Sequence, residues 1–176
     1  MEENSLSGGV VDGQLAGVTT GTNTICVVYN KDIFDQAGVE YPDDEWTWSE
    51  FLQTAKAVYD ATGIQTEIPF LSEARWAVEA MVRSYGSDFF SEDGTAIAWA
   101  DNETIVSAVV NTIQSIYEGV QDGYLVDPEV QVAWSATEDF YISQGNAAMS
   151  LILSNYYSTY SQALGKELGM VMVPQM

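Results

Sequence analysis

Apolar residues along the chain fall into short unbroken runs and longer periodic stretches. The short runs have the length of strands and lie at 24–30, 66–71, 95–99, 147–154 and 168–174. The run at 24–30 is rich in β-branched residues and shows little alternation, which predicts a strand buried on both faces. Near the start, Asp12 and Gly13 stand between two apolar stretches, and this pair predicts a hairpin or the entry to a strand.

The periodic stretches predict helices, and polar residues mark where they begin and end. Thr47 and Glu50 form a capping box before the clearest helical stripe, which stops at Gly63. Asn30 and Gly38 bracket a shorter helix, as an N-cap and a left-handed stop. The same signals predict further helices near 72–86, 101–119 (with Asp101 as its cap), 137–143 and 155–165.

Strands and helices alternate along the sequence, with no internal repeat and no low-complexity tract. This alternation predicts the α/β fold class, as a three-layer α/β/α sandwich in which helices cover a sheet. The length of 176 residues suits a single domain that needs no disulfide or metal for stability. A hydrophobic fraction of 47% marks the chain as globular despite its charge.

The charge balance limits the possible partners. Five Lys and Arg against 26 Asp and Glu give a formal net charge of -21. Such a chain repels phosphate backbones and anionic lipid head groups, so nucleic acid and membrane surfaces are not expected as partners. The acidic residues favour a solvated surface, with a surface for calcium or a cationic ligand as the alternative. The acidic stretch at 89–94 lacks the spaced carboxylates of a calcium loop, and we interpret it as a turn.

The residue types present argue against most catalytic and metal sites. The chain contains no His, which removes the commonest general base and the usual zinc ligand. Its one cysteine, Cys26, lies among apolar residues and is expected to be a small buried hydrophobe. No segment reaches the ~18 apolar residues of a spanning helix. We therefore expect no catalytic residue, no cofactor and no metal, although a pair of carboxylates acting on glycosides stays formally possible.

Two stretches in the first third of the chain resemble a known family. "VVYNKDIFDQAGV" and "WTWSEFLQTAKAV", separated by a Pro-containing linker, resemble the carbohydrate-binding family of extracytoplasmic solute-binding proteins of ABC importers, which includes maltose-binding protein. The family shows a strand ending in Tyr-Asn-Lys, a short helix closing in Ala-Gly, and a Thr-Trp-x-Glu-Phe helix start. "DFYISQGNAAMSL" and "GMVMVPQM" extend the similarity, which covers about Gly13 to Pro174.

The resemblance implies a protein with two lobes joined by a hinge, with the ligand between them. It places residues 13–176 on the second lobe of a periplasmic-binding-protein-like (type II) fold, with residues 1–12 as an added leader and linker. The hinge crossings are then expected near 21–24 and 173–176.

The resemblance also implies which residues contact the ligand. The strand that enters the lobe places a polar contact on Asn23, with Thr22 beside it. A stacking aromatic at the start of the next helix falls on Trp76. Its neighbour Arg75 is interpreted either as a partner for a sugar hydroxyl or an acidic sugar's carboxylate, or as half of a surface salt bridge.

A further ligand contact is expected after the strand at 147–154. The family often has a Trp there, whereas this chain has Asn155 and Tyr156, followed by a second tyrosine. An aromatic face beside a few amides and hydroxyls is what a sugar requires.

The function implied is sugar binding followed by closure of the two lobes and docking on the membrane permease subunits of an ABC importer, with no catalysis. The location expected is extracytoplasmic, either periplasmic or as a cell-surface lipoprotein, and the lobe is expected to be monomeric. Alternatives that stay open are a binding protein for a polyamine or peptide, a scaffold or adhesion role, and a glycoside-acting enzyme.

Overall fold

A three-stranded antiparallel sheet lies at the centre of the computed structural model, which describes residues 9–18, 21, 23–69, 75–127 and 140–176, without the side chains of 75 and 76. The strands are β3 (Ile25–Tyr29), β4 (Met149–Leu153) and β5 (Gly169–Met172), in the order β4-β3-β5. Ile25 lies opposite Leu153, and Cys26 lies opposite Ile152 on one side and Met172 on the other. The predicted strands at 24–30, 147–154 and 168–174 are therefore confirmed.

Two extended segments continue this sheet beyond β4. Glu67 forms a parallel bridge with Ser150, and Thr66 forms another with Leu125. The Val126 N–H donates to the Thr66 carbonyl at 2.9 Å, which ties the outer segment to the inner one. The extended segment expected at 66–71 is confirmed at its first two residues.

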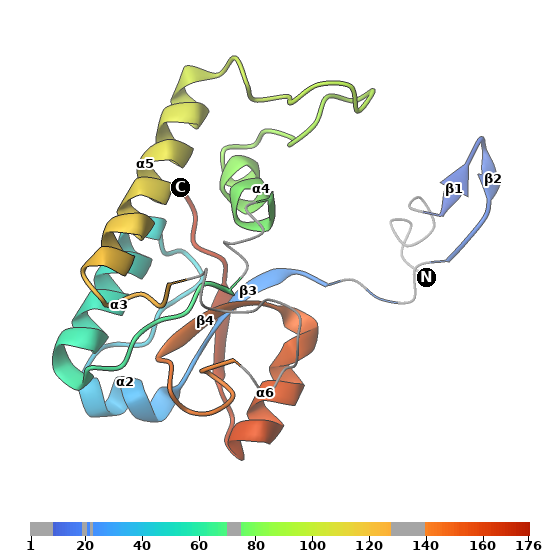
Figure 1. Ribbon diagram of the computed structural model, residues 1–176. Coiled ribbons are helices and arrows are strands. Elements are labelled where there is room, and N and C mark those ends of the chain that lie inside the picture. The colour runs from blue at the N-terminus through green and yellow to red at the C-terminus, as the bar shows by residue number, and fades with distance from the viewer. Residues whose placement is uncertain (1–8, 19–20, 22, 70–74, 128–139) are drawn as a thin grey trace.

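Helices cover both faces of the sheet (Figure 1). On one face lie α2 (Lys31–Ala37), α3 (Trp48–Thr62), α4 (Arg75–Ser84) and α5 (Glu103–Gln121). The other face is covered by α6 (Tyr157–Leu164), which follows the 3₁₀ turn η3 (Ser154–Tyr156), and by the segment 140–147. Alternate residues of β3 point into the two cores, Val27 into the first and Cys26 and Val28 into the second. The strand is buried on both faces, as its composition predicts.

The helix boundaries follow the capping signals. The Thr47 hydroxyl accepts from the Glu50 N–H, and the Glu50 carboxylate accepts from the Thr47 N–H at 2.7 Å, which completes the capping box of α3. Asn30 caps α2, and Gly38 ends it with a φ of 67°. The cap of α5 is Asn102 and not Asp101, because the Asn102 side chain accepts from the Ile105 N–H.

Two predicted elements are also wrong within the described residues. The segment 95–99 is no strand: it makes one isolated bridge, between Phe90 and Ile97, around a turn in which the Asp93 carboxylate accepts from Ser91 and Thr95. The helix predicted at 137–143 has residues 137–139 outside the described part, and its remainder forms turns through Gly145. In these turns a backbone N–H donates to the carbonyl three residues earlier, as from the Ser143 N–H to the Phe140 carbonyl.

The hairpin predicted near the start is confirmed. Strands β1 (Val10–Val11) and β2 (Gln14–Leu15) pair antiparallel across Asp12 and Gly13. Both turn residues have positive φ, 51° and 74°, as a tight two-residue hairpin requires. The hairpin spans the boundary expected between residues 12 and 13, and it stands away from the sheet and its helices (Figure 1).

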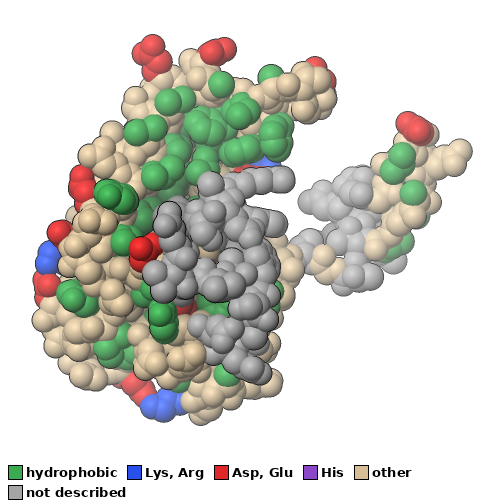
Figure 2. Space-filling model, viewed as in Figure 1, with side chains coloured by type: hydrophobic (Ala, Val, Ile, Leu, Met, Phe, Trp, Pro, Cys, Tyr) green, Lys and Arg blue, Asp and Glu red, His purple; other side chains and the backbone are tan. Residues whose placement is uncertain are grey.

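Cys26 is 3% exposed, and burial raises the pKa of its thiol to about 11, which confirms it as a buried hydrophobe. On the surface, hydrophobic side chains gather over α5 in Figure 2. Two exposed apolar residues of this helix are Val110 and Tyr117, at 55% and 63% exposure. Among the described helices, none combines the length and apolar character needed to cross a membrane.

Candidate ligand-binding site

At one end of the sheet β3 begins while β4 and β5 end. Both hinge crossings are expected at this end. Ile25 begins β3 opposite the last residue of β4, Leu153. The Thr24 N–H donates to the Ser154 hydroxyl at 3.1 Å, and the Ser154 N–H donates to the Thr24 carbonyl at 2.8 Å. Val173 follows β5 at the same end, because Met172 lies opposite Cys26. The sheet register therefore brings Thr24, before β3, and Val173, after β5, close together.

A pocket of about 290 Å³ lies at this end, between the strands and α4. We call it the strand-end pocket. It is lined by Asn23, Thr24, Ile25, Glu79, Ala80, Arg83, Leu153 and Val173. The strands supply an apolar floor, and the polar groups come from the chain before β3 and from one side of α4.

An ion pair on α4 forms the polar wall of the strand-end pocket. Arg83 donates to one carboxylate oxygen of Glu79 from Nη2 at 2.9 Å and from Nε at 3.1 Å. Its Nη1 lies 3.4 Å from Asp88. The Arg83 side chain is 57% exposed, so the pair adds little to stability and stays available to a ligand. The spacing of four residues on a helix could have identified the pair in the sequence, but not its position at a pocket.

The structure brings one of the six predicted contact residues to this pocket. Asn23 is among its lining residues. Arg75 and Trp76 begin α4, with their side chains outside the described residues, as is Thr22. Trp76 precedes Ala80 by four residues, about one helical turn, and Ala80 lines the pocket.

Asn155 and Tyr156 follow the end of β4 in η3, close to the strand ends but outside the pocket lining. The Tyr156 ring stacks on Tyr160, with centroids 5.7 Å apart and an angle of 9° between the rings. One face of Tyr156 is therefore already covered from α6, and only its other face could take a ligand.

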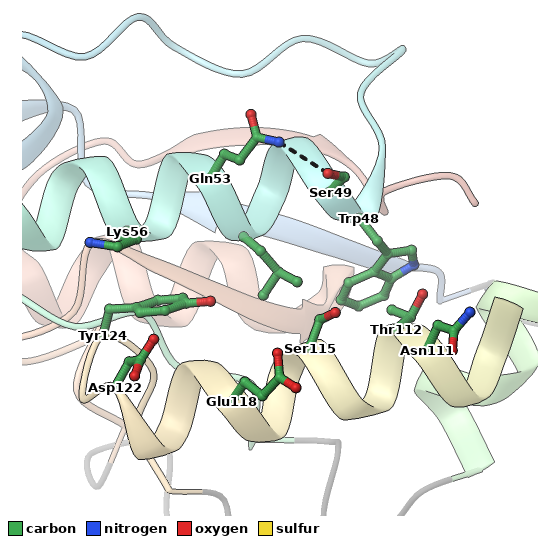
Figure 3. Close-up of a pocket in the computed structure, with 11 residues that line it drawn as sticks. Trp48, Ser49, Gln53, Lys56, Asn111, Thr112, Ser115, Glu118, Asp122 and Tyr124 are labelled. Carbon is green, nitrogen blue, oxygen red and sulfur yellow. Dashed lines mark hydrogen bonds between the residues drawn. The ribbon is translucent and has the colours of Figure 1, made fainter.

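A second and larger depression of about 380 Å³ lies between α3 and α5 (Figure 3). We call it the α3–α5 groove. Its lining is Trp48, Ser49, Leu52, Gln53, Lys56, Asn111, Thr112, Ser115, Glu118, Asp122 and Tyr124. In Figure 3 the side chains of the two helices face each other, with Trp48 at one end and Lys56 and Tyr124 at the other.

The two aromatic walls of this groove belong to the core. Trp48 is 3% exposed and Tyr124 is 8% exposed, and both pack in the main hydrophobic cluster. Burial raises the pKa of the Tyr124 phenol, and the negative charge of Asp122 adds to this effect. Lys56 pairs with Asp60 at 2.7 Å. Little aromatic surface is therefore free to stack on a ligand in the groove.

An α/β lobe whose strand ends carry an open pocket with an apolar floor and a polar wall is suited to binding a ligand between itself and a second surface. Within the described residues, no group of three His, Cys, Asp or Glu side chains is arranged to hold a metal ion. The chain belongs to the bacterial extracellular solute-binding protein family, whose model matches residues 2–174. Members of this family bind solutes and are not enzymes, and membership implies an extracytoplasmic location.

Similar proteins agree with this assignment. An arabinooligosaccharide-binding protein of Halalkalibacterium halodurans is 36% identical over 84 residues, which is 47% of this chain and 18% of the relative. An extracellular solute-binding protein of family 1 from Alicyclobacillus acidocaldarius matches 99% of this chain with a TM-score of 0.73 at 20% identity. An ABC substrate-binding protein of Listeria monocytogenes, solved with cycloalternan, matches 96% with a TM-score of 0.73 at 23% identity.

The structural matches confirm the predicted fold, an α/β lobe of the periplasmic-binding-protein-like type II class. The chain spans 42% of the length of both solved structures and less of the first curated relative.

Proposed function

We propose that the chain is the second lobe of a two-lobe binding protein of an ABC importer, and that it binds a carbohydrate at the strand-end pocket. The observation that carries this proposal is the position of Asn23, which lies at a pocket where the two expected hinge crossings meet. In a two-lobe protein, the surface beside the hinge faces the other lobe and forms one wall of the cleft.

The chemistry of the pocket suits a sugar. Ile25, Leu153 and Val173 give an apolar floor for the C–H face of a ring, and the Asn23 amide offers both a donor and an acceptor for hydroxyl groups. Trp76, at the start of α4, is proposed as the stacking aromatic. The relatives named for arabinooligosaccharide and cycloalternan binding support a carbohydrate as the ligand.

A cationic solute such as a polyamine is the second candidate, because the net charge of -21 attracts cations at long range. The charges at the strand-end pocket argue against a cationic ligand. Its one carboxylate in the described lining is Glu79, which already binds Arg83, and Arg83 repels an ammonium group.

In this proposal the ligand draws the two lobes together, and the closed form docks on the membrane permease subunits. A lobe alone supplies one wall of the cleft and binds weakly, because most of the ligand surface stays exposed. Residues 1–12 act as leader and linker, and the lobe is monomeric. The protein is located outside the cytoplasm, either in the periplasm or held at the cell surface by a lipid anchor.

Calorimetric titration of the 176-residue chain tests the proposal, with maltose and arabinotriose as neutral ligands and spermidine as the cationic one. We expect weak binding of at least one neutral sugar and none of spermidine. Binding of spermidine alone would overturn the carbohydrate assignment in favour of a cationic solute.

A further inference from the structure

The ion pair between Glu79 and Arg83 lies at the strand-end pocket, where its charges act on any bound ligand. Both residues lie on the side of α4 that lines the strand-end pocket, with Ala80 between them. The pair therefore faces the ligand site rather than open solvent alone.

The pair offers both donors and acceptors without a net charge. Arg83 uses Nη2 and Nε on a single oxygen of Glu79, and its exposed guanidinium has five N–H donors in all. Glu79 contributes carboxylate oxygens that accept. A hydroxyl group both donates and accepts, so it can bond to either partner without breaking the pair.

A charged ligand is both attracted and repelled by the charges of this ion pair. A carboxylate on the ligand would compete with Glu79 and Asp88 for Arg83 and would be repelled by both acids. An ammonium group would compete with Arg83 for Glu79 and would be repelled by the guanidinium. A ligand carboxylate thus gains one attraction and suffers two repulsions, whereas an ammonium group gains the attraction of Glu79 and suffers the repulsion of Arg83.

We propose that the Glu79–Arg83 pair determines specificity by making the strand-end pocket favour neutral hydroxylated ligands over their charged analogues. This inference rests on the proposed function, since it assumes that the strand-end pocket is the sugar site. Removing either charge should bias the pocket toward the ligand charge that the remaining partner attracts.

The chain provides a matched control. Lys56 and Asp60 form an ion pair with the same spacing on α3, at 2.7 Å; Lys56 is about as exposed as Arg83, and Asp60 is more exposed than Glu79. Neither residue lines the strand-end pocket. Neutralising this second pair changes the net charge by the same amount and leaves the pocket as it is.

The test uses glucose, glucuronate and glucosamine, which share one ring and differ in charge, with dissociation constants from NMR titration of the 176-residue chain. In Glu79→Gln the preference for glucuronate over glucose should rise about two- to fivefold, the range expected for exposed charges. In Arg83→Gln the preference for glucosamine should rise by a similar factor. Both changes should shrink at high salt.

The controls Asp60→Asn and Lys56→Gln should leave both preferences unchanged, and melting curves establish that all four variants fold. If Glu79→Gln and Arg83→Gln match their controls while the wild-type chain binds glucose, the specificity role is wrong and the proposed function stands. If the wild-type chain binds glucosamine alone, or none of the three, the result contradicts the proposed function itself.

Discussion

The strand-end pocket and the α3–α5 groove differ in what forms their walls. The groove is larger, about 380 Å³ against 290 Å³, and it carries two aromatic side chains. Those aromatics are core residues, and their rings are buried against other apolar side chains. The strand-end pocket has no aromatic in its described lining, but it lies where three strands end and where Asn23 precedes the central strand.

The difference teaches that position in the fold is a better guide to the ligand site than the size of a depression. A groove between two helices arises wherever helices pack side by side and polar residues border the contact. A pocket at the ends of adjacent strands, beside the points where the chain is expected to cross to another lobe, has a second wall available. Substitutions at the two places should therefore have opposite effects on stability and on binding.

The largest effect should come from the groove and should concern stability. Trp48→Ala removes a side chain that is 3% exposed and packs edge-on against Phe51. We expect it to lower the free energy of unfolding by about 3–5 kcal/mol, as measured by chemical denaturation. Gln53→Ala, on the exposed rim of the same groove, should stay within about 0.5 kcal/mol of the wild type. Equal stabilities for the two variants would show that Trp48 is not a core residue.

Trp76→Ala should weaken ligand binding and leave stability nearly unchanged, the opposite of what is expected for Trp48→Ala. If Trp76 stacks on a sugar, its removal should lower sugar affinity at least about tenfold with little change in melting temperature. Titration calorimetry and thermal melting of the same samples measure both quantities. An unchanged affinity together with a large drop in melting temperature would make Trp76 a core residue.

Asn23→Ala should have a smaller effect on binding. The substitution removes one neutral hydrogen-bonding group, worth about 0.5–1.5 kcal/mol, so sugar affinity should fall about twofold to tenfold. Stability should not change measurably, since Asn23 is exposed in the lobe. A variant that binds as well as the wild type would remove Asn23 from the site.

The smallest effect is expected from Ser115→Ala, which takes a hydroxyl from the wall of the α3–α5 groove. Sugar affinity should stay within about twofold of the wild type. A loss comparable to that of Asn23→Ala would mean that the groove, and not the strand-end pocket, holds the ligand.

Local signals in the sequence predicted the parts of the fold that depend on neighbouring residues. The capping box of Thr47 and Glu50 and the left-handed stop at Gly38 act within a few residues, and both appear in the structure. The strand predicted at 95–99 is wrong because apolar residues alone do not make a strand: within the described residues no strand pairs with this segment, and Asp93 stabilises a turn.

The site was only partly predictable for the same reason. Asn23 could be placed because it directly precedes a strand whose identity was clear. The Glu79–Arg83 pair has a recognisable spacing, but its side of α4 faces the strand ends only through packing of α4 on the sheet. Tyr156 looked free to stack on a ligand, and the packing of α6 places Tyr160 against one of its faces.

The most direct test of the central claim is an NMR map of backbone amide shifts in the 176-residue chain as a neutral sugar such as maltose or arabinotriose is added. The account predicts that the largest shifts fall on Asn23, Leu153, Val173 and the Glu79–Arg83 segment of α4, with Ser49, Gln53 and Ser115 unmoved. Shifts confined to the α3–α5 groove would contradict it.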